Sequence, residues 1–357
     1  MSHISVFAID TVQKAFYTSA LTHREIVGIL SSDKYDEALF FYADLARKTH
    51  NGNDVHLKGL LEFSNVCERN CFYCGLRRQN KILKRYALKP DEIIAFAQKA
   101  IAYGYKTIVL QSGENNIYKI DDLCGAITAI RDMGAHVTLS LGEKSREEYA
   151  AYKQAGANRY LLRIETTDPS LYKQLHPSMS HQNRFNCLTT LQELGYETGS
   201  GSLVGLPNQT LSSIADDILF FKESDFDMIG IGPFIPNENT PLGDERGGDF
   251  VLALKVMAIV RLLLPKINIP ATTAMETLDK NGRIRALQCG ANVVMPVVTE
   301  GEYRKLYRLY PGKICLDDAP RHCRGCITGK IMAIGRGVSA TNGDSVRFGD
   351  RLAAQGG

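Results

Sequence analysis

The sequence contains no uninterrupted apolar run of the roughly 18 to 20 residues that a membrane-spanning helix requires. Its first ten residues lack the basic segment followed by an apolar stretch that is typical of a secretory signal. Neither sign of charge is in excess, since 42 Lys and Arg against 39 Asp and Glu leave a formal net charge of +3. These absences predict a cytoplasmic protein, and they give no reason to expect nucleic acid or a membrane as a partner.

Low-complexity linkers are also absent before about residue 335. Hydrophobic residues make up 44% of the 357 residues and are spread evenly, which excludes disorder and favours a globular protein with a large core. From residue 335 onward the sequence becomes polar and rich in glycine, and we expect a surface extension there.

Hydrophobic periodicity predicts N-terminal helices followed by repeated strand–helix units. The predicted strands are "VHLKGLLEFSN", "KTIVLQSG", "AHVTLSLGE", "RYLLRIE", "YETGSGSLVGLP", "FDMIGIGPFIP", "NIPATTAM" and "NVVMPVV". Eight such units in a chain of this length favour an α/β fold of the (βα)8 TIM-barrel type over an open doubly wound sheet. We therefore expect N-terminal helices in residues 1–55, a complete barrel in 56–310 and a C-terminal extension in 311–357.

Six of the nine cysteines lie in two clusters. The first cluster, "CERNCFYC", places Cys67, Cys71 and Cys74 at CxxxCxxC spacing on the loop that leaves the first predicted strand. Soft thiolates select zinc or iron–sulfur centres. A structural zinc site usually has a fourth ligand in a second Cys or His pair, and no such pair follows nearby. The trio therefore favours a [4Fe–4S] cluster with one open iron, with structural zinc or unligated thiols as the alternative.

The triad, with Tyr73 directly before its last cysteine, resembles the signature of the radical S-adenosylmethionine (SAM) superfamily. In that superfamily the open iron binds SAM, and reduction cleaves SAM into methionine and a 5′-deoxyadenosyl radical. Two further segments resemble its SAM-binding elements. The "QSGE" segment, with Gln111, Ser112 and Glu114, matches the element that receives the SAM amino group, and Ile231 lies in "IGIGPFIP", which is similar to the adenine-contacting segment.

Within this superfamily the chain resembles the HydE family of [FeFe]-hydrogenase maturases from about residue 10 to about residue 330. The stretches that carry the resemblance include "FSNVCERNCFYCGLRRQNKILKRY", "NRFNCLTTLQELGYETGSGSLVGLP" and "YRKLYRLYPGKIC". The resemblance implies a radical SAM enzyme that acts in assembling the di-iron subcluster of the hydrogenase H-cluster. It implies a small iron–carbonyl–cyanide–cysteine substrate, other hydrogenase maturases as partners, and an electron donor such as ferredoxin or flavodoxin.

The same resemblance assigns roles to residues beyond the cysteines. Glu165 and Arg184 match positions that bind the ammonium and the carboxylate of SAM, a zwitterion that needs one acceptor and one fixed-charge donor. The match to the lining of the substrate cavity covers Thr138, Ser140, Arg163, Thr272, Thr273, Met295 and Tyr307. The sequence departs from the family pattern at Ile164, where that pattern has His, and after residue 295, where it has Trp.

The second cysteine cluster comprises Cys315, Cys323 and Cys326 in "CLDDAPRHCRGC". The resemblance implies an auxiliary [2Fe–2S] or [4Fe–4S] cluster at this position, and a surface zinc or no metal stays open. The remaining cysteines lie singly among apolar neighbours, where we expect small buried core residues: Cys124, Cys187 and Cys289.

Three other functions compete with hydrogenase maturation. A biotin synthase-like sulfur insertion is disfavoured because no cysteine set faces the predicted barrel interior. A methylornithine synthase-like amino-acid mutase shares the SAM residues, and the C-terminal cysteine trio favours HydE over it. A non-catalytic iron–sulfur carrier would have no use for the SAM-binding residues.

Overall fold

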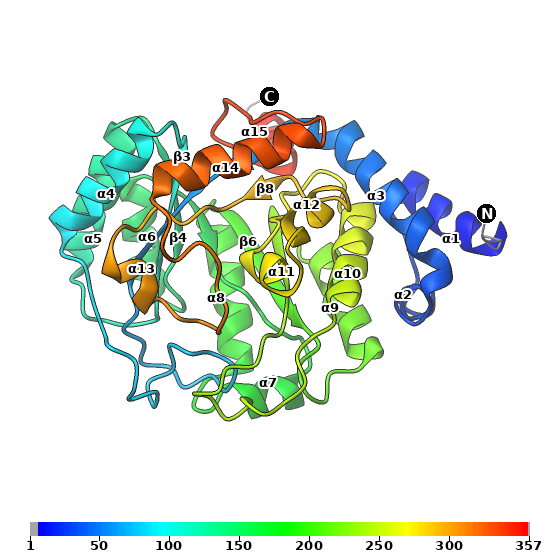
Figure 1. Cartoon of the computed structure of the whole chain (residues 1–357), viewed down its shortest axis with the longest axis horizontal. Helices are drawn as coiled ribbons and strands as arrows, with labels where there is room; N and C mark the ends of the chain where they lie inside the picture. The colour runs from blue at the N-terminus through cyan, green and yellow to red at the C-terminus, as the bar shows by residue number, and fades with distance from the viewer. Residues whose placement is uncertain (1–5, 356–357) are drawn as a thin grey trace.

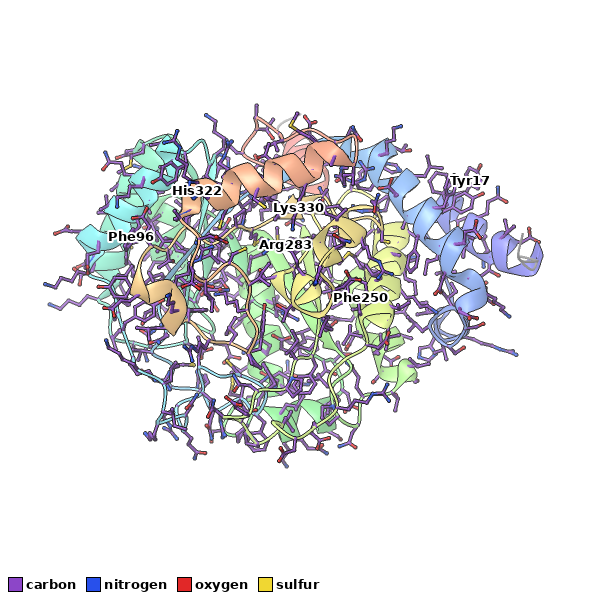
Figure 2. The ribbon with its side chains drawn as sticks, in the orientation of Figure 1. Tyr17, Phe96, Phe250, Arg283, His322 and Lys330 are labelled. Atoms are coloured by element: carbon purple, nitrogen blue, oxygen red, sulfur yellow. The ribbon has the colours of Figure 1, made fainter. Side chains whose placement is uncertain are left out.

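The computed structural model describes residues 6–355. Helices α1 (Val6–Thr18), α2 (His23–Leu30) and α3 (Asp36–Asn51) project from one side of the molecule (Figure 1). Helix α3 packs along α10 (Phe250–Leu263), whose last eleven residues are all buried. The predicted N-terminal helices are present, and all three pack against α10. Figure 2 shows Tyr17 of α1 on the side of the molecule opposite Phe96 and His322.

A six-stranded parallel sheet with the order β2-β3-β4-β5-β6-β7 forms the centre of the molecule. Its strands are Gly59–Ser64, Thr107–Ser112, His136–Ser140, Ala157–Leu161, Glu197–Val204 and Met228–Pro233. The helices between and after these strands are α4 (Pro90–Ala102), α5 (Ile120–Asp132), α6 (Arg146–Ala155), α7 (Pro169–Leu175), α8 (His181–Glu193), α9 (Leu211–Glu223) and α10. Parallel strands with helical crossovers confirm the predicted α/β class.

A second parallel sheet contains only β1 (His56–Leu57) and β8 (Val293–Val294). Single backbone bridges link it to both edges of the larger sheet. Asn268 pairs with β7, Pro270 pairs with β8, and Val297, just after β8, pairs with β2.

The prediction of a regular strand in "NIPATTAM" is wrong. Only the isolated bridges at Asn268 and Pro270 form there, because proline has no N–H for a β-ladder. Thr272 then serves as the N-cap of helix α11 (Thr273–Leu278). Three further short elements are η1 (Asp33–Tyr35), α12 (Gly282–Leu287) and α13 (Glu302–Leu306), and the longer helix α14 (Pro320–Ala333) follows them.

Most residues of the C-terminal segment from 335 to 354 are exposed or half-exposed, which agrees with the predicted surface extension, and the segment is ordered. Buried Arg159 and Glu197, at the starts of β5 and β6, bond to each other and to this segment. Arg159 pairs with Asp344, and the Ser345 amide donates to Glu197 Oε1 at 2.9 Å. Helix α15 (Val346–Gln355) follows. The segment is held in place because these buried charges need partners.

The two ends of the central sheet therefore differ. The long loop between β2 and α4, which carries the first cysteine cluster, lies at one end, and α15 lies at the other (Figure 1). Of the singly placed cysteines, Cys187 and Cys289 are buried as predicted and Cys124 is half-buried. No helix within residues 6–355 is long and apolar enough to cross a membrane.

Candidate active site

A cavity of about 410 Å³ opens at the carboxyl ends of the strands. This volume lies in the range of roughly 300–1,000 Å³ that small-molecule sites occupy. The cavity brings together most of the predicted site residues: Cys67, Cys71, Tyr73, Cys74, Gln111, Ser112, Glu114, Ser140, Arg163, Glu165, Arg184, Thr272, Thr273, Met295 and Tyr307. Side chains from distant parts of the sequence thus face one space.

Two predicted site residues do not line this cavity. Ile231 is fully buried in the core, while Gly230 and Gly232 face the cavity, because side chains alternate along β7. Thr138 is fully buried on β4, two residues before the cavity-lining Ser140. Contrary to the prediction, the side chains of Ile231 and Thr138 therefore do not form part of the cavity wall.

The first cysteine cluster reaches the cavity from the loop after β2. A Cβ at Gly113 would lie 2.7 Å from Cys67 Cβ, so only glycine permits this close approach of β3 to the loop. Burial raises the pKa of all three thiols, and the neighbouring cysteine charge contributes further at Cys71, whose pKa is about 12, and at Cys74. Three buried thiolates whose negative charges oppose one another are unfavourable unless a cation joins them. The donor set therefore fits an iron–sulfur cluster, which supplies that positive charge.

Tyr73 is held by His176, a residue that the sequence did not single out. His176 Nδ1 donates to the Tyr172 carbonyl oxygen at 3.0 Å, so its Nε2 accepts from the Tyr73 hydroxyl at 2.8 Å. Burial lowers the pKa of His176 to about 3, which keeps the ring neutral. This chain of hydrogen bonds fixes the Tyr73 ring in the cavity wall.

Glu165 has a backbone φ of +66°, a left-handed conformation that is uncommon for residues other than glycine. Its carboxylate Oε2 lies 3.0 Å from Arg163 Nη2 but has no hydrogen bond from any described residue. Burial raises the pKa of Glu165, and the positive charges of Arg163 and Arg184 oppose this shift. A buried acceptor oxygen at the cavity wall suits a ligand ammonium group.

Arg184 is fixed by two hydrogen bonds. Its Nε donates to Glu143 Oε1 at 2.7 Å, and its Nη1 donates to the Arg163 carbonyl oxygen at 2.6 Å. Glu143 was missed by the sequence analysis, although "LGE" after β4 repeats the Gly-Glu pair that follows β3. Because a donor with fixed orientation loses little entropy on binding, Arg184 is well placed for a ligand carboxylate.

Glu114 belongs to the same network. Arg69 donates to Glu114 and lies 4.0 Å from Glu143. Gly142 has a φ of +78°, and a Cβ there would lie 2.6 Å from Glu114 Cβ. Burial raises the pKa of Glu114, and Arg184 opposes the shift. The "GE" pairs after β3 and β4 thus pack against each other around two arginines.

Glu62 and Lys313 also line the cavity and were not predicted. A signal was present at Glu62, because an acidic residue interrupts the otherwise apolar strand "GLLEFS". Lys313 lies outside any helix or strand, so periodicity carried no signal for it.

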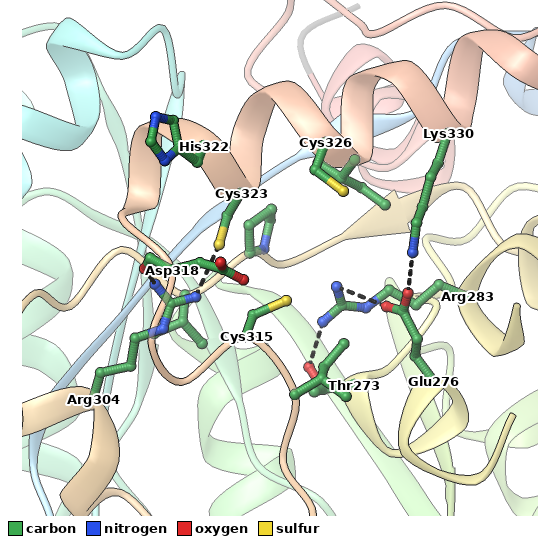
Figure 3. Close-up of a pocket in the computed structure, with 14 residues that line it drawn as sticks. Thr273, Glu276, Arg283, Arg304, Cys315, Asp318, His322, Cys323, Cys326 and Lys330 are labelled. Carbon is green, nitrogen blue, oxygen red and sulfur yellow. Dashed lines mark hydrogen bonds and ion pairs between the residues drawn. The ribbon is translucent and has the colours of Figure 1, made fainter. Parts of the chain in front are cut away.

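The second cysteine cluster lies in a separate cavity of about 150 Å³ beside α14 (Figure 3). Cys315 Sγ, a carboxylate oxygen of Asp318 and Cys323 Sγ lie within 4.8 Å of one another, while Cys326 is exposed and outside this group. Asp318 was not predicted. A hydrogen bond with Cys315 lowers the pKa of Cys323 to about 6, and Arg304, which donates to Cys323 Sγ at 3.1 Å, adds to the shift.

One residue, Thr273, lines both cavities. Arg283 donates to Thr273 Oγ1 at 2.7 Å and pairs with Glu276 at 3.1 Å (Figure 3). Lys330 completes this group through a 2.5 Å contact with Glu276. The charged side chains between the two cavities are therefore paired with one another.

Comparison with known proteins relates the chain to radical SAM enzymes. The model of the radical SAM superfamily matches residues 61–221. The [FeFe] hydrogenase maturase subunit HydE of Thermotoga maritima is 55% identical over 302 residues, which cover 85% of this chain and 87% of that protein. A 3-methylornithine synthase of Methanosarcina acetivorans is 30% identical over 272 residues, 75% of this chain and 77% of that protein.

Solved structures support the fold. A methylornithine synthase superposes with a TM-score of 0.82 at 24% identity and covers 96% of this chain and 99% of its own. The [FeFe]-hydrogenase maturase HydG superposes with a TM-score of 0.79 at 20% identity and covers 94% of this chain and 76% of its own. At these identities the likeness concerns the fold alone.

Proposed function

The chain belongs to the HydE family of radical SAM [FeFe]-hydrogenase maturases, and we propose that it directs SAM cleavage at a small iron complex carrying carbon monoxide, cyanide and cysteine. The observation that carries this proposal is the single cavity that three cysteines, an acceptor carboxylate, a fixed arginine and several hydroxyl groups all face. Membership of this family implies SAM binding and reductive SAM cleavage.

Both charged groups at the amino-acid end of SAM have a proposed partner in the cavity wall. Cys67, Cys71 and Cys74 hold the [4Fe–4S] cluster, which when reduced supplies the electron that cleaves SAM. Glu165 accepts the SAM ammonium on Oε2, and Arg184 donates to the carboxylate. The further SAM contacts come from Tyr73, Gln111, Ser112, Glu114 and the backbone beside Ile231.

The substrate occupies the rest of the cavity. Ser140, Thr272 and Thr273 donate hydrogen bonds to cyanide or carboxylate groups, and Arg163 neutralises negative charge. Met295 and Tyr307 supply a less polar wall, and Thr138 supports Ser140 from below. We propose that the bridges at Asn268, Pro270 and Val297 close the sheet into a complete (βα)8 barrel, which shields a reactive radical from water.

The proposal also covers the remaining parts of the chain. Residues 1–55, 56–310 and 311–357 act as N-terminal helices, catalytic barrel and C-terminal extension. Cys315, Cys323 and Cys326 bind a second [2Fe–2S] or [4Fe–4S] cluster. The enzyme works in the cytoplasm with other hydrogenase maturases and with ferredoxin or flavodoxin as electron donor.

The test is in vitro maturation of apo-hydrogenase by the partner maturases, with the reconstituted protein included or omitted. We expect active hydrogenase only when the protein is present, and 5′-deoxyadenosine when dithionite and SAM are added to it anaerobically. Equal hydrogenase activity in both mixtures would refute the role. Conversion of lysine to methylornithine would instead support the mutase alternative. That alternative is tested because the chain is 30% identical to a 3-methylornithine synthase.

A further inference from the structure

A buried ion pair lies in the wall of the cavity beside β2. Glu62 points inward from β2, and Lys313 reaches it from the segment after α13, with Lys313 Nζ 2.5 Å from Glu62 Oε1. The side chains are 1% and 5% exposed, and both residues line the cavity. Neither residue has a role in the SAM contacts assigned above.

Glu62 and Glu165, the proposed acceptor of the SAM ammonium, are placed by different strands, although Glu62 neighbours Gln111, another proposed SAM contact. Glu62 is in register with Gln111 on β3, and Gln111 is in register with Ser140 on β4. Glu165 follows β5, which is three strands away from β2 in the sheet order. The Glu62 carboxylate therefore faces the cavity from β2, whereas the Arg163–Glu165 pair faces it from the segment after β5.

A purely structural role explains this pair poorly. A buried ion pair often fails to recover the free energy of removing both charges from water, and apolar residues of similar size commonly replace such pairs without loss. Burial raises the pKa of Glu62, and Lys313 opposes this shift. A second positive group near Glu62 would therefore stabilise its ionised form further.

The pair also has unused hydrogen-bonding capacity. Lys313 donates to Glu62 Oε1 and, at 3.4 Å, to the Tyr307 carbonyl oxygen. Glu62 Oε2 is buried and receives no hydrogen bond from any residue within 6–355. Because buried carboxylate oxygens are almost always hydrogen-bonded, a donor from a ligand is the missing partner.

We infer that Glu62 and Lys313 form a subsite that binds the amino group of an amino-acid ligand carried by the substrate. Glu62 Oε2 accepts the hydrogen bond from the ligand ammonium, and Lys313 holds the carboxylate in position. Arg163, in the segment after β5, neutralises the anionic groups, so the cavity suits a zwitterionic cysteine ligand better than a purely anionic molecule. This inference rests on the proposed function, because it specifies how the substrate of that function is recognised.

The test measures binding of L-cysteine and of 3-mercaptopropionate, which lacks the amino group, to the SAM-loaded holoenzyme by anaerobic calorimetry. The variant Glu62→Gln/Lys313→Met removes both charges together and leaves no lone buried ion. A matched control, Asp36→Asn/Lys255→Met, removes a Lys–carboxylate pair with a 2.8 Å contact that joins the start of α3 to α10. Glu62→Gln/Lys313→Gln, which also removes both charges, serves as a second variant in case the first does not fold.

The wild type and the control variant are expected to bind L-cysteine about tenfold more tightly than 3-mercaptopropionate, the size of one hydrogen bond to a charged group. The Glu62 variants are expected to lose most of this preference. A preference that persists in these variants, or its absence in the wild type, overturns the subsite. A wrong proposed function instead fails the hydrogenase maturation assay, so the two failures are distinguishable.

Discussion

The two cysteine clusters share a CxxC pair but occupy different surroundings. The first cluster faces a cavity of about 410 Å³ with an acceptor carboxylate at Glu165 and an oriented donor at Arg184. The second lies beside a cavity of about 150 Å³, where Cys326 is exposed and the charged side chains are paired with one another. Thiolates favour soft metals, and at the first site an acceptor carboxylate oxygen without a hydrogen bond and an oriented guanidinium face the same cavity as the cysteines.

The largest difference between the two clusters is expected when one cysteine is removed from each. Cys71→Ser should reduce 5′-deoxyadenosine formation to background, because the first cluster supplies the electron for SAM cleavage. Cys326→Ser should lower the iron content yet leave SAM cleavage within about twofold, because that cluster lies outside the SAM site. Product analysis after dithionite addition, together with iron determination, checks both outcomes. Equal losses in the two variants would show that the clusters do not have separate roles.

The second test compares two buried arginines of equal exposure. Arg184 and Arg283 are each 9% exposed, and each pairs with a buried glutamate. Arg184→Met should raise the KM for SAM about tenfold to a hundredfold, since a charged hydrogen bond to the SAM carboxylate is lost. Arg283→Met should leave that KM within about twofold. A similar increase in both variants would mean that Arg184 acts through folding rather than through SAM.

A smaller effect is expected from Arg304 at the second cluster. Arg304→Met should raise the pKa of Cys323 from about 6, because one of the groups that stabilise its thiolate is removed. At pH 7 the metal-free protein then carries less thiolate at Cys323, and the ultraviolet absorbance of the thiolate falls. If the absorbance across the titration is the same in the variant and the wild type, Arg304 does not stabilise the Cys323 thiolate.

The smallest expected effects come from matched glycine substitutions beside the two clusters. Gly142→Ala should lower the free energy of unfolding by about 1–3 kcal/mol, because φ is +78° and the added methyl group meets Glu114. Gly325→Ala, inside α14 with nothing within 4 Å of an added Cβ, should raise it by about 0.5–1 kcal/mol. Denaturant unfolding of the metal-free protein measures both changes. If both substitutions changed the free energy of unfolding in the same direction, the prediction would be wrong.

The regular elements and the first cysteine cluster were predictable because their signals are local. Alternating apolar runs mark each buried strand, and three cysteines within eight residues converge on one centre wherever the loop lies. The strand predicted in "NIPATTAM" failed for an equally local reason, since Pro270 lacks the N–H that would extend the isolated bridges into a ladder and Thr272 caps a helix.

The amino-acid sequence by itself therefore determined the α/β class, the soft-metal trio and, through resemblance, the family. Only the tertiary structure decided which distant groups meet: Lys313 with Glu62 across 251 positions, Glu143 with Arg184, and Asp318 with the second cysteine cluster. It also decided that the polar C-terminal segment is ordered against Arg159 and Glu197. The physical reason is that burial makes an unpaired charge costly, so packing selects partners that periodicity and spacing do not encode.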